Sequence, residues 1–133
     1  MPISEFTSQE VLDVCLNEWK KTLFLDDWII KARIVHPDEF IEENVCGENE
    51  FDQVNKCCVI RILNKKDYGD RVIKYCAEKI LVHELLHCKY NWVVPSDAYE
   101  GKYFDTMDHA LLEQMAKSLI MAKYGLTLDY FIG

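Results

Sequence analysis

Glycine and proline are scarce in this sequence. Its 133 residues include only 5 glycines and 3 prolines, and these are scattered rather than clustered. The chain also lacks internal repeats and the low-complexity runs that often join separate domains. Half of the residues are hydrophobic, which is enough to bury one core. We therefore expect a single domain over residues 1–133.

Basic clusters and long apolar runs are missing as well. The net charge is −8, and the longest basic runs, Lys20-Lys21 and Lys65-Lys66, are too short to neutralise a phosphate backbone. This excludes nucleic acid as an expected partner. No apolar run approaches the roughly 18 residues that suggest a membrane span. The start, Met1 to Ser4, lacks the basic and apolar regions of a secretory signal, so we expect a cytoplasmic location without a membrane partner.

The cysteines do not form metal-binding pairs in the sequence. No C-x-x-C pair occurs, which excludes a zinc ribbon. A disulfide framework is not expected in a chain without a secretory signal. We expect most of the six cysteines to be reduced, buried and apolar in behaviour: Cys15, Cys46, Cys57, Cys58, Cys76 and Cys88.

The spacing of apolar residues predicts a helix followed by a strand. Thr7 is predicted as the N-cap of a capping box with Glu10, and the helical stripe continues to about Lys21. From Trp28 to Val35 the pattern alternates, which predicts a half-buried strand.

The middle of the chain is predicted to hold one more strand and a long helix. The acidic stretch from Asp38 to Asp52 has no regular pattern and is expected to be irregular, with a turn at Gly47. Alternation predicts the second strand from Val54 to Leu63. A long helix is predicted from about Val72 to Tyr90, and a loop from Asn91 to Phe104.

A last helix and an apolar tail complete the chain. Asp105 or Thr106 is predicted to cap this helix, which runs to about Tyr124 and stops at Gly125. The tail from Leu126 to Gly133 is expected to pack on the core, with docking into a cleft of the protein as the alternative. The element order predicts an α+β fold, in which a small antiparallel or mixed sheet packs against the two long helices.

The predicted long helix carries the sequence His83-Glu84-Leu85-Leu86-His87, the H-E-x-x-H pattern. Residues four apart lie about 40° apart around a helix, so both imidazoles project from one side and can bind one zinc ion. Glu84 lies about 100° from His83 and can reach a zinc-bound water as general base. The competing interpretation is a pair of structural histidines beside a solvated glutamate.

A catalytic zinc ion needs a third protein ligand. His36 stands before Pro37 at a strand end and is expected to be exposed. His109 and Glu113 are four residues apart on the last predicted helix and so share a face. We expect His109 to be the third ligand and Glu113 to hold a ligand imidazole from behind, and the reverse assignment remains open.

The two helices together resemble those of gluzincins, the thermolysin-like metallopeptidases. The similarity is greatest to very small members, the minigluzincins and phage-encoded proteins of this type. Gluzincins follow the motif helix with Asn-Glu-x-x-x-Asp, whose Glu binds zinc and whose Asp supports a zinc-bound histidine. That pattern falls here on Asp108 to Glu113, and His109 follows His87 by 109 − 87 = 22 residues, comparable with the family interval. The stretches "DDWIIKARIV" and "IRILNKKDYG" also resemble the phage-type group, so the similarity runs from Leu12 to Leu119.

The sequence departs from the gluzincin pattern at two positions. His109 stands where gluzincins have the ligand glutamate, and Lys89 stands where zincin patterns usually have an apolar residue. Metzincins are excluded, because Tyr90 and Val93 occupy their glycine and third histidine positions.

The resemblance implies a zinc-dependent peptide-bond hydrolase that acts on a peptide or protein, with Glu84 as general base. Candidate donors to the oxyanion are Tyr90, Tyr99, Tyr103 and Tyr124. The outer edge of either predicted strand can pair with an extended substrate. Two alternatives remain: a catalytically silent or autoinhibited zinc-binding domain that acts through protein–protein interaction, and a phage-type regulatory protease directed at a repressor.

Overall fold

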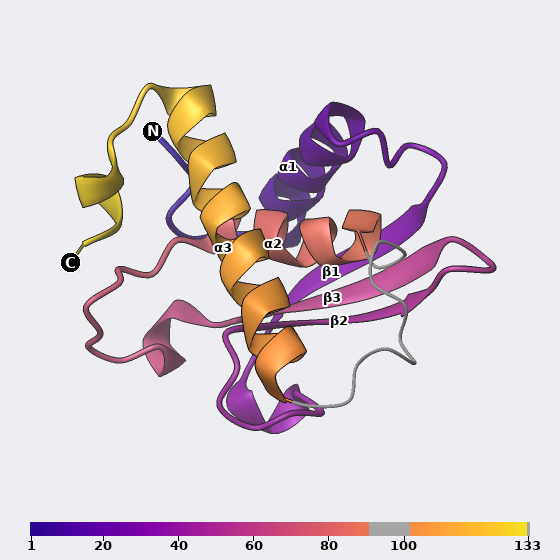
Figure 1. The fold of residues 1–133 in the computed structure, drawn as a ribbon, viewed down its shortest axis with the longest axis horizontal. Coiled ribbons are helices and arrows are strands. Elements are labelled where there is room, and N and C mark those ends of the chain that lie inside the picture. The colour runs from indigo at the N-terminus through magenta and orange to yellow at the C-terminus, as the bar shows by residue number, and fades with distance from the viewer. Residues whose placement is uncertain (91–101, 133) are drawn as a thin grey trace.

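The computed structural model describes residues 1–90 and 102–132, with side chains in the second range from Asp108 onward (Figure 1). Three α-helices and a three-stranded mixed sheet make up most of the described chain, which confirms the predicted α+β class. In chain order they are α1 (Gln9–Thr22), β1 (Ile29–Val35), β2 (Gly47–Asp52), β3 (Cys57–Leu63), α2 (Ala77–Tyr90) and α3 (Lys102–Tyr124).

The sheet has the order β1-β3-β2. β1 runs parallel to β3, with Ile29 opposite Cys57, and β2 runs antiparallel to it, with Gly47 opposite Ile62. The predicted second strand is therefore the central strand, and it begins at Cys57 rather than Val54. Both of its edges are occupied, so the expected pairing of this strand with a substrate is wrong.

The prediction of an irregular stretch up to Asp52 is also wrong, because β2 occupies its last six residues. The strand was hidden by its acidic side chains, which do not alternate with apolar ones. Glu48 is nevertheless buried, because Arg61 on β3 donates to its Oε1 atom from Nη1 at 2.8 Å. Its carboxylate also accepts the backbone N–H groups of Ile41 and Glu42.

α1 and α2 pack on one face of the sheet, and α3 packs against α2, which therefore lies at the centre of the three helices. Alternate residues of β1 and β3 are buried on this face, among them Ile30, Ala32 and Ile60. α2 contacts both neighbouring helices as well as β2 and β3, and most of its residues are buried. A helix surrounded on almost all sides in this way is apolar around most of its circumference. Polar residues on it must therefore have partners.

The boundaries of all three helices differ from the prediction. Ser8, not Thr7, caps α1, because its Oγ atom accepts the Val11 N–H at 3.2 Å. α2 begins only at Ala77, because the preceding residues pair with the C-terminal tail, where the Lys74 N–H donates to the Phe131 carbonyl. α3 begins at Lys102, before both predicted caps. Its predicted stop at Gly125 is confirmed, since that residue has a φ of 65°.

The two ends of the chain pack beside the start of α2. The N–H groups of Ala77 and Glu78 donate to the carbonyls of Ser4 and Ile3, which satisfies two donors of the first helical turn. The side chain of Phe131 is fully buried in the core. The tail therefore packs on the core, as expected, rather than in the cavity described below.

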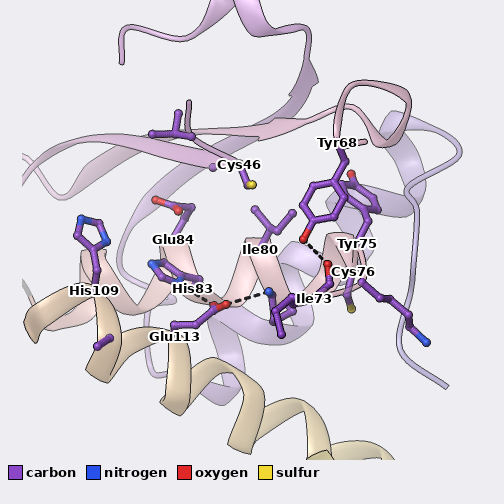
Figure 2. A pocket seen from close by; sticks show the side chains of 15 residues that line it. Cys46, Tyr68, Ile73, Tyr75, Cys76, Ile80, His83, Glu84, His109 and Glu113 are labelled. Carbon is purple, nitrogen blue, oxygen red and sulfur yellow. Dashed lines mark hydrogen bonds and ion pairs between the residues drawn. The ribbon is translucent and has the colours of Figure 1, made fainter. Parts of the chain in front are cut away.

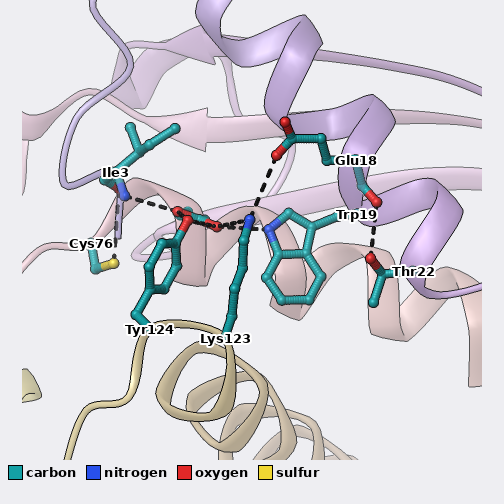
Figure 3. A network of polar contacts seen from close by, with 8 residues as sticks. Ile3, Glu18, Trp19, Thr22, Cys76, Lys123 and Tyr124 are labelled. Carbon is teal, nitrogen blue, oxygen red and sulfur yellow. Dashed lines mark hydrogen bonds and ion pairs between the residues drawn. The ribbon is translucent and has the colours of Figure 1, made fainter. Parts of the chain in front are cut away.

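A buried carboxylate joins these segments. Glu78 is fully buried and accepts hydrogen bonds from the Ile3 N–H, Trp19 Nε1 and the Tyr124 hydroxyl at 2.7–2.8 Å. Lys123 Nζ lies 3.2 Å from it and compensates its charge. Figure 3 shows these side chains converging from α1, α3 and the N-terminal segment.

The six cysteines are unpaired in the structure. Cys15, Cys58, Cys76 and Cys88 are buried, as predicted, whereas Cys46 and Cys57 are half-buried. Burial raises the pKa of the Cys15 thiol to about 12, which keeps it protonated and unreactive near neutral pH. None of the described helices is long and apolar enough to cross a membrane.

We expect Glu78→Ala to lower the free energy of unfolding by about 3 kcal/mol or more, because it leaves several buried donors and a cation without their acceptor. Urea unfolding followed by circular dichroism measures the change. Glu18→Ala is the matched control, since the Glu18 carboxylate is exposed and only 3.6 Å from the same Lys123. Its expected cost is below about 0.5 kcal/mol. Equal losses in the two variants would contradict the role given to Glu78.

Candidate metal centre

Two imidazoles meet on one face of α2. His83 and His87 lie one helical turn apart, and their Nε2 atoms are 3.1 Å from each other. Both residues are half-buried. Burial, the charge of His83 and the charge of His109 lower the pKa of His87 to about 3. The His87 ring is therefore neutral at ordinary pH, which is the form that binds a metal ion.

α3 brings a third imidazole to this pair. The ring of His109 lies 4.7 Å from that of His87 and 5.9 Å from that of His83, measured between centroids. One nitrogen from each ring lies within 4.8 Å of the other two. The three histidines are thus close enough to bind one metal ion. His109 is the exposed member of the group, so the site is open on the α3 side.

Glu113 faces the opposite nitrogen of His83. Its Oε1 atom lies 3.0 Å from His83 Nδ1, and its Oε2 atom accepts from Lys79 Nζ at 2.9 Å. Burial opposes its ionisation, but the His83 hydrogen bond and the Lys79 ammonium lower the pKa of Glu113 to about 2. An ionised acceptor at Nδ1 assigns the proton of His83 to that atom, which leaves Nε2 free for a metal ion.

Two further groups support the centre and were not expected from the sequence. Asp108 Oδ2 lies 3.7 Å from His87 Nδ1, the same side of the ring that Glu113 takes on His83. Lys79 is buried within α2 and holds Glu113. Asp108 belongs to the stretch compared with the gluzincin pattern, so its position was a usable signal. No sequence signal pointed to Lys79, because its partner Glu113 lies 34 residues away.

Glu84 projects from α2 toward β2. It is buried, and its Oε1 atom accepts from Asn49 Nδ2 at 2.7 Å. Burial raises the pKa of its carboxyl, against the opposing effects of the His83 charge and the Asn49 hydrogen bond. The backbone of Gly47 passes directly beside it, so close that a Cβ atom there would lie 2.8 Å from Glu84 Oε2. Strand β2 thus fixes the carboxylate from one side.

A cavity of about 420 Å³ opens beside these groups. Figure 2 shows His83, Glu84, His109 and Glu113 at its border, with Cys46, Tyr68 and Ile80 along its walls. The Tyr68 and Tyr75 hydroxyls in its lining donate to the backbone carbonyls of Ile73 and Leu63. Both hydroxyls are therefore bound, and the side chains of His83, Glu84, His109 and Glu113 lie together at one end of the cavity, while Lys74 is a further polar residue in the lining.

The structure separates the four tyrosines that were considered as oxyanion donors. The Tyr124 hydroxyl donates to Glu78 near the far end of α3, away from the histidines. Tyr90 is half-buried and is the last residue of α2, three residues after His87. Tyr99 and the side chain of Tyr103 lie outside the described residues. The fourth histidine, His36, is exposed as expected and lies 3.0 Å from Asp67.

Comparisons with models of protein families, with curated proteins and with solved structures gave no match. The resemblance to gluzincins therefore remains a prediction that depends on the motif residues.

We expect the protein to bind one divalent metal ion per chain, measured by calorimetric titration with zinc and by elemental analysis. His109→Ala should abolish stoichiometric binding, because only two of the three imidazole ligands would remain to hold the ion. Glu113→Gln should weaken binding about 10- to 100-fold, because it supports a ligand rather than binding the ion. His36→Ala is the control and should bind normally. Full occupancy in His109→Ala, with loss in Glu113→Ala, would instead support Glu113 as the third ligand.

We also expect Gly47→Ala to destabilise the fold by about 1–3 kcal/mol, because its Cβ would lie 2.8 Å from both Glu84 Oε2 and Ile80 Cγ2. Urea unfolding of this variant, of Glu84→Ala and of the double variant forms a thermodynamic cycle. Destabilisation by the double variant should be less than the sum of the single effects, because one clashing group is gone. Strict additivity would contradict a contact between Gly47 and the Glu84 carboxylate.

Proposed function

We propose that this protein is a zinc-dependent peptide-bond hydrolase, with His83, His87 and His109 as metal ligands and Glu84 as general base. The observation that carries this proposal is the meeting of three imidazoles beside a buried carboxylate, with the carboxylate and two of the imidazoles, His83 and His109, lining one cavity. Structural histidines have no need of a neighbouring carboxylate with a raised pKa, whereas hydrolysis does.

The donor set suits zinc. Three neutral imidazoles with one open position are typical of catalytic zinc sites. Nitrogens bound to zinc at about 2.0–2.1 Å in a tetrahedral arrangement lie about 3.3 Å apart, close to the 3.1 Å between the Nε2 atoms of His83 and His87. Zinc in such a site supplies Lewis acidity, which lowers the pKa of a water molecule and polarises a carbonyl group.

Each protein group then has a defined task. Glu84 accepts the proton of the attacking water and delivers it to the nitrogen of the leaving amine. Its raised pKa makes the carboxylate a stronger base for the first of these transfers. Asn49 holds one oxygen of Glu84, which leaves the other free for the proton. Glu113, fixed by Lys79, keeps the His83 ring in its orientation.

The position of β2 supports a peptide as substrate. This strand pairs only with β3, so its other edge is free among the described residues. Gly47 and Asn49 on the same strand contact Glu84. An extended peptide paired with this edge therefore passes beside the carboxylate, and one of its side chains can enter the neighbouring cavity. Among the described tyrosine side chains, Tyr90 remains the candidate to stabilise the oxyanion.

The alternative is a zinc-binding domain that acts only through protein contacts. The tail gives no support to an autoinhibited form, since Phe131 is buried in the core and the residues that line the cavity lie outside the tail. A regulatory protease directed at a repressor would use the same chemistry as the leading proposal. Catalysis itself is thus the property that separates the two classes.

We expect Glu84→Gln to retain zinc and to lose activity at least about 100-fold, because the amide cannot accept the proton. A library of quenched fluorescent peptides, assayed with zinc-loaded protein, measures cleavage, and elemental analysis measures the metal. Glu10→Gln, an exposed substitution on α1, is the control and should cleave normally. Zinc binding without cleavage of any peptide by the unmodified protein would reject the hydrolase and favour the protein-contact class.

A further inference from the structure

Strand β1 forms the edge of the sheet that is remote from the metal centre. Its odd-numbered residues direct their backbone groups toward β3, since the Ile29 N–H donates to Lys56 O and the Val35 carbonyl accepts from the Asn64 N–H. Backbone groups on a strand alternate in direction, so those of Ile30, Ala32 and Ile34 point to the outside. Apart from the Ala32 carbonyl, these outward groups have no hydrogen-bond partner among the described residues, so a further strand can satisfy them.

One of these groups is already bound in the way a neighbouring strand would bind it. The side-chain amide of Gln9, at the start of α1, donates from Nε2 to the Ala32 carbonyl at 2.7 Å. The same Nε2 donates to Asp13 Oδ1 at 2.8 Å. An amide N–H on this carbonyl is the interaction that an added strand makes through its backbone. Gln9 is exposed, so its side chain can give way to such a strand.

A groove of about 490 Å³ runs along this edge. One wall is formed by residues 30–33 of β1, and the other by one face of α1 with Gln9, Asp13 and Asn17. These three side chains are exposed and polar, so they can bind the free edge of an incoming strand. At about 3.3 Å per residue, β1 with its seven residues offers pairing along roughly 23 Å.

The β1 wall of the groove carries two positive charges, whereas the α1 wall carries the single carboxylate of Asp13. Lys31 and Arg33 lie two residues apart on β1, so they share one face of the strand, and both are exposed. Neither forms an ion pair with any residue that the structure describes. On β3 their neighbours in register are Val59 and Arg61, and Arg61 is occupied by Glu48 and Glu50. Carboxylates at alternate positions of an added strand would lie beside both free cations.

We propose that this groove binds an extended, acidic segment of a partner protein, which adds to the sheet as a fourth strand beside β1. The partner is distinct from the substrate of the proposed hydrolase, because the strand order places β1 and β2 at opposite edges of the sheet. The inference depends only on the groove, the free backbone groups and the two cations. A result that rejects the metal centre would therefore leave this inference unchanged, and the reverse is also true.

A second copy of the chain is a poorer occupant. A two-fold antiparallel pairing of β1 centred on Ala32 places Lys31 of each copy opposite Arg33 of the other. Like charges directly opposite each other destabilise a strand pair. An acidic strand removes this repulsion and replaces it with attraction, so charge selects the partner.

Fluorescence anisotropy with two labelled octapeptides tests the proposal: one alternates glutamate and valine, the other lysine and valine. The unmodified protein should bind the acidic peptide and not the basic one. The double variant Lys31→Glu/Arg33→Glu should bind the acidic peptide at least 10-fold more weakly and should gain affinity for the basic one. Lys65→Glu/Lys66→Glu makes the same change of charge at exposed residues elsewhere and should leave binding unchanged.

Amide hydrogen exchange locates the bound peptide on the unmodified protein. The N–H groups of Ile30, Ala32 and Ile34 should exchange more slowly when the acidic peptide is present. The proposal is overturned if the acidic peptide does not bind, if both double variants bind it equally, or if the slowed amides lie elsewhere. A two-fold dimer through β1, detected by sedimentation, would overturn the choice of occupant.

Discussion

The buried carboxylate of Glu78 is the interaction on which the arrangement of the helices depends. It stands at the start of α2 and accepts hydrogen bonds from the N-terminal segment, from Trp19 on α1 and from Tyr124 on α3. A carboxylate without these donors would be costly at a fully buried position. The requirement to satisfy it therefore fixes the end of α3 against α2. His109 lies on the same helix, so its approach to the other two histidines follows from a contact at the far end.

A second polar chain fixes the two helices at the centre itself. Lys79 and His83 on α2 share the carboxylate of Glu113 on α3, so that a cation, an anion and an imidazole lie in sequence. Glu78 and Glu113 thus tie α3 to α2 at two points along its length. This explains how a helix with many exposed residues is held firmly enough to complete a metal centre. Such polar support of the ligands matters more in a small protein, because its small hydrophobic core contributes less to holding the helices in place.

Local patterns in the sequence were sufficient to predict the fold class and the three histidines of the candidate metal centre. The spacing of His83 and His87 fixes their common face once α2 is a helix, and His109 followed from counting histidines and from the comparison with gluzincins. The features that could not be predicted depend on contacts between residues far apart in the chain. The start of α2 was placed at Val72 because residues 72–76 look helical, whereas they pair with the tail. β2 was missed because Glu48 is stabilised by Arg61, a partner 13 residues away. Asn49 and Lys79 gave no signal for the same reason.

The parallel pairing of β1 with β3 has an entropic consequence. Ile29 and Cys57, its first pair, are 57 − 29 = 28 residues apart, whereas Asp52 and Cys57 of the neighbouring pair are 57 − 52 = 5 apart. Closing the longer loop costs about 1.5 kcal/mol more in chain entropy. β1 is therefore held in the sheet by the burial of residues such as Ile30 and Ala32 under α1 rather than by the connectivity of the chain. Local opening of the sheet should begin on this side, which leaves β3 and the short-loop hairpin it forms with β2, beside Glu84, as the more persistent part of the sheet.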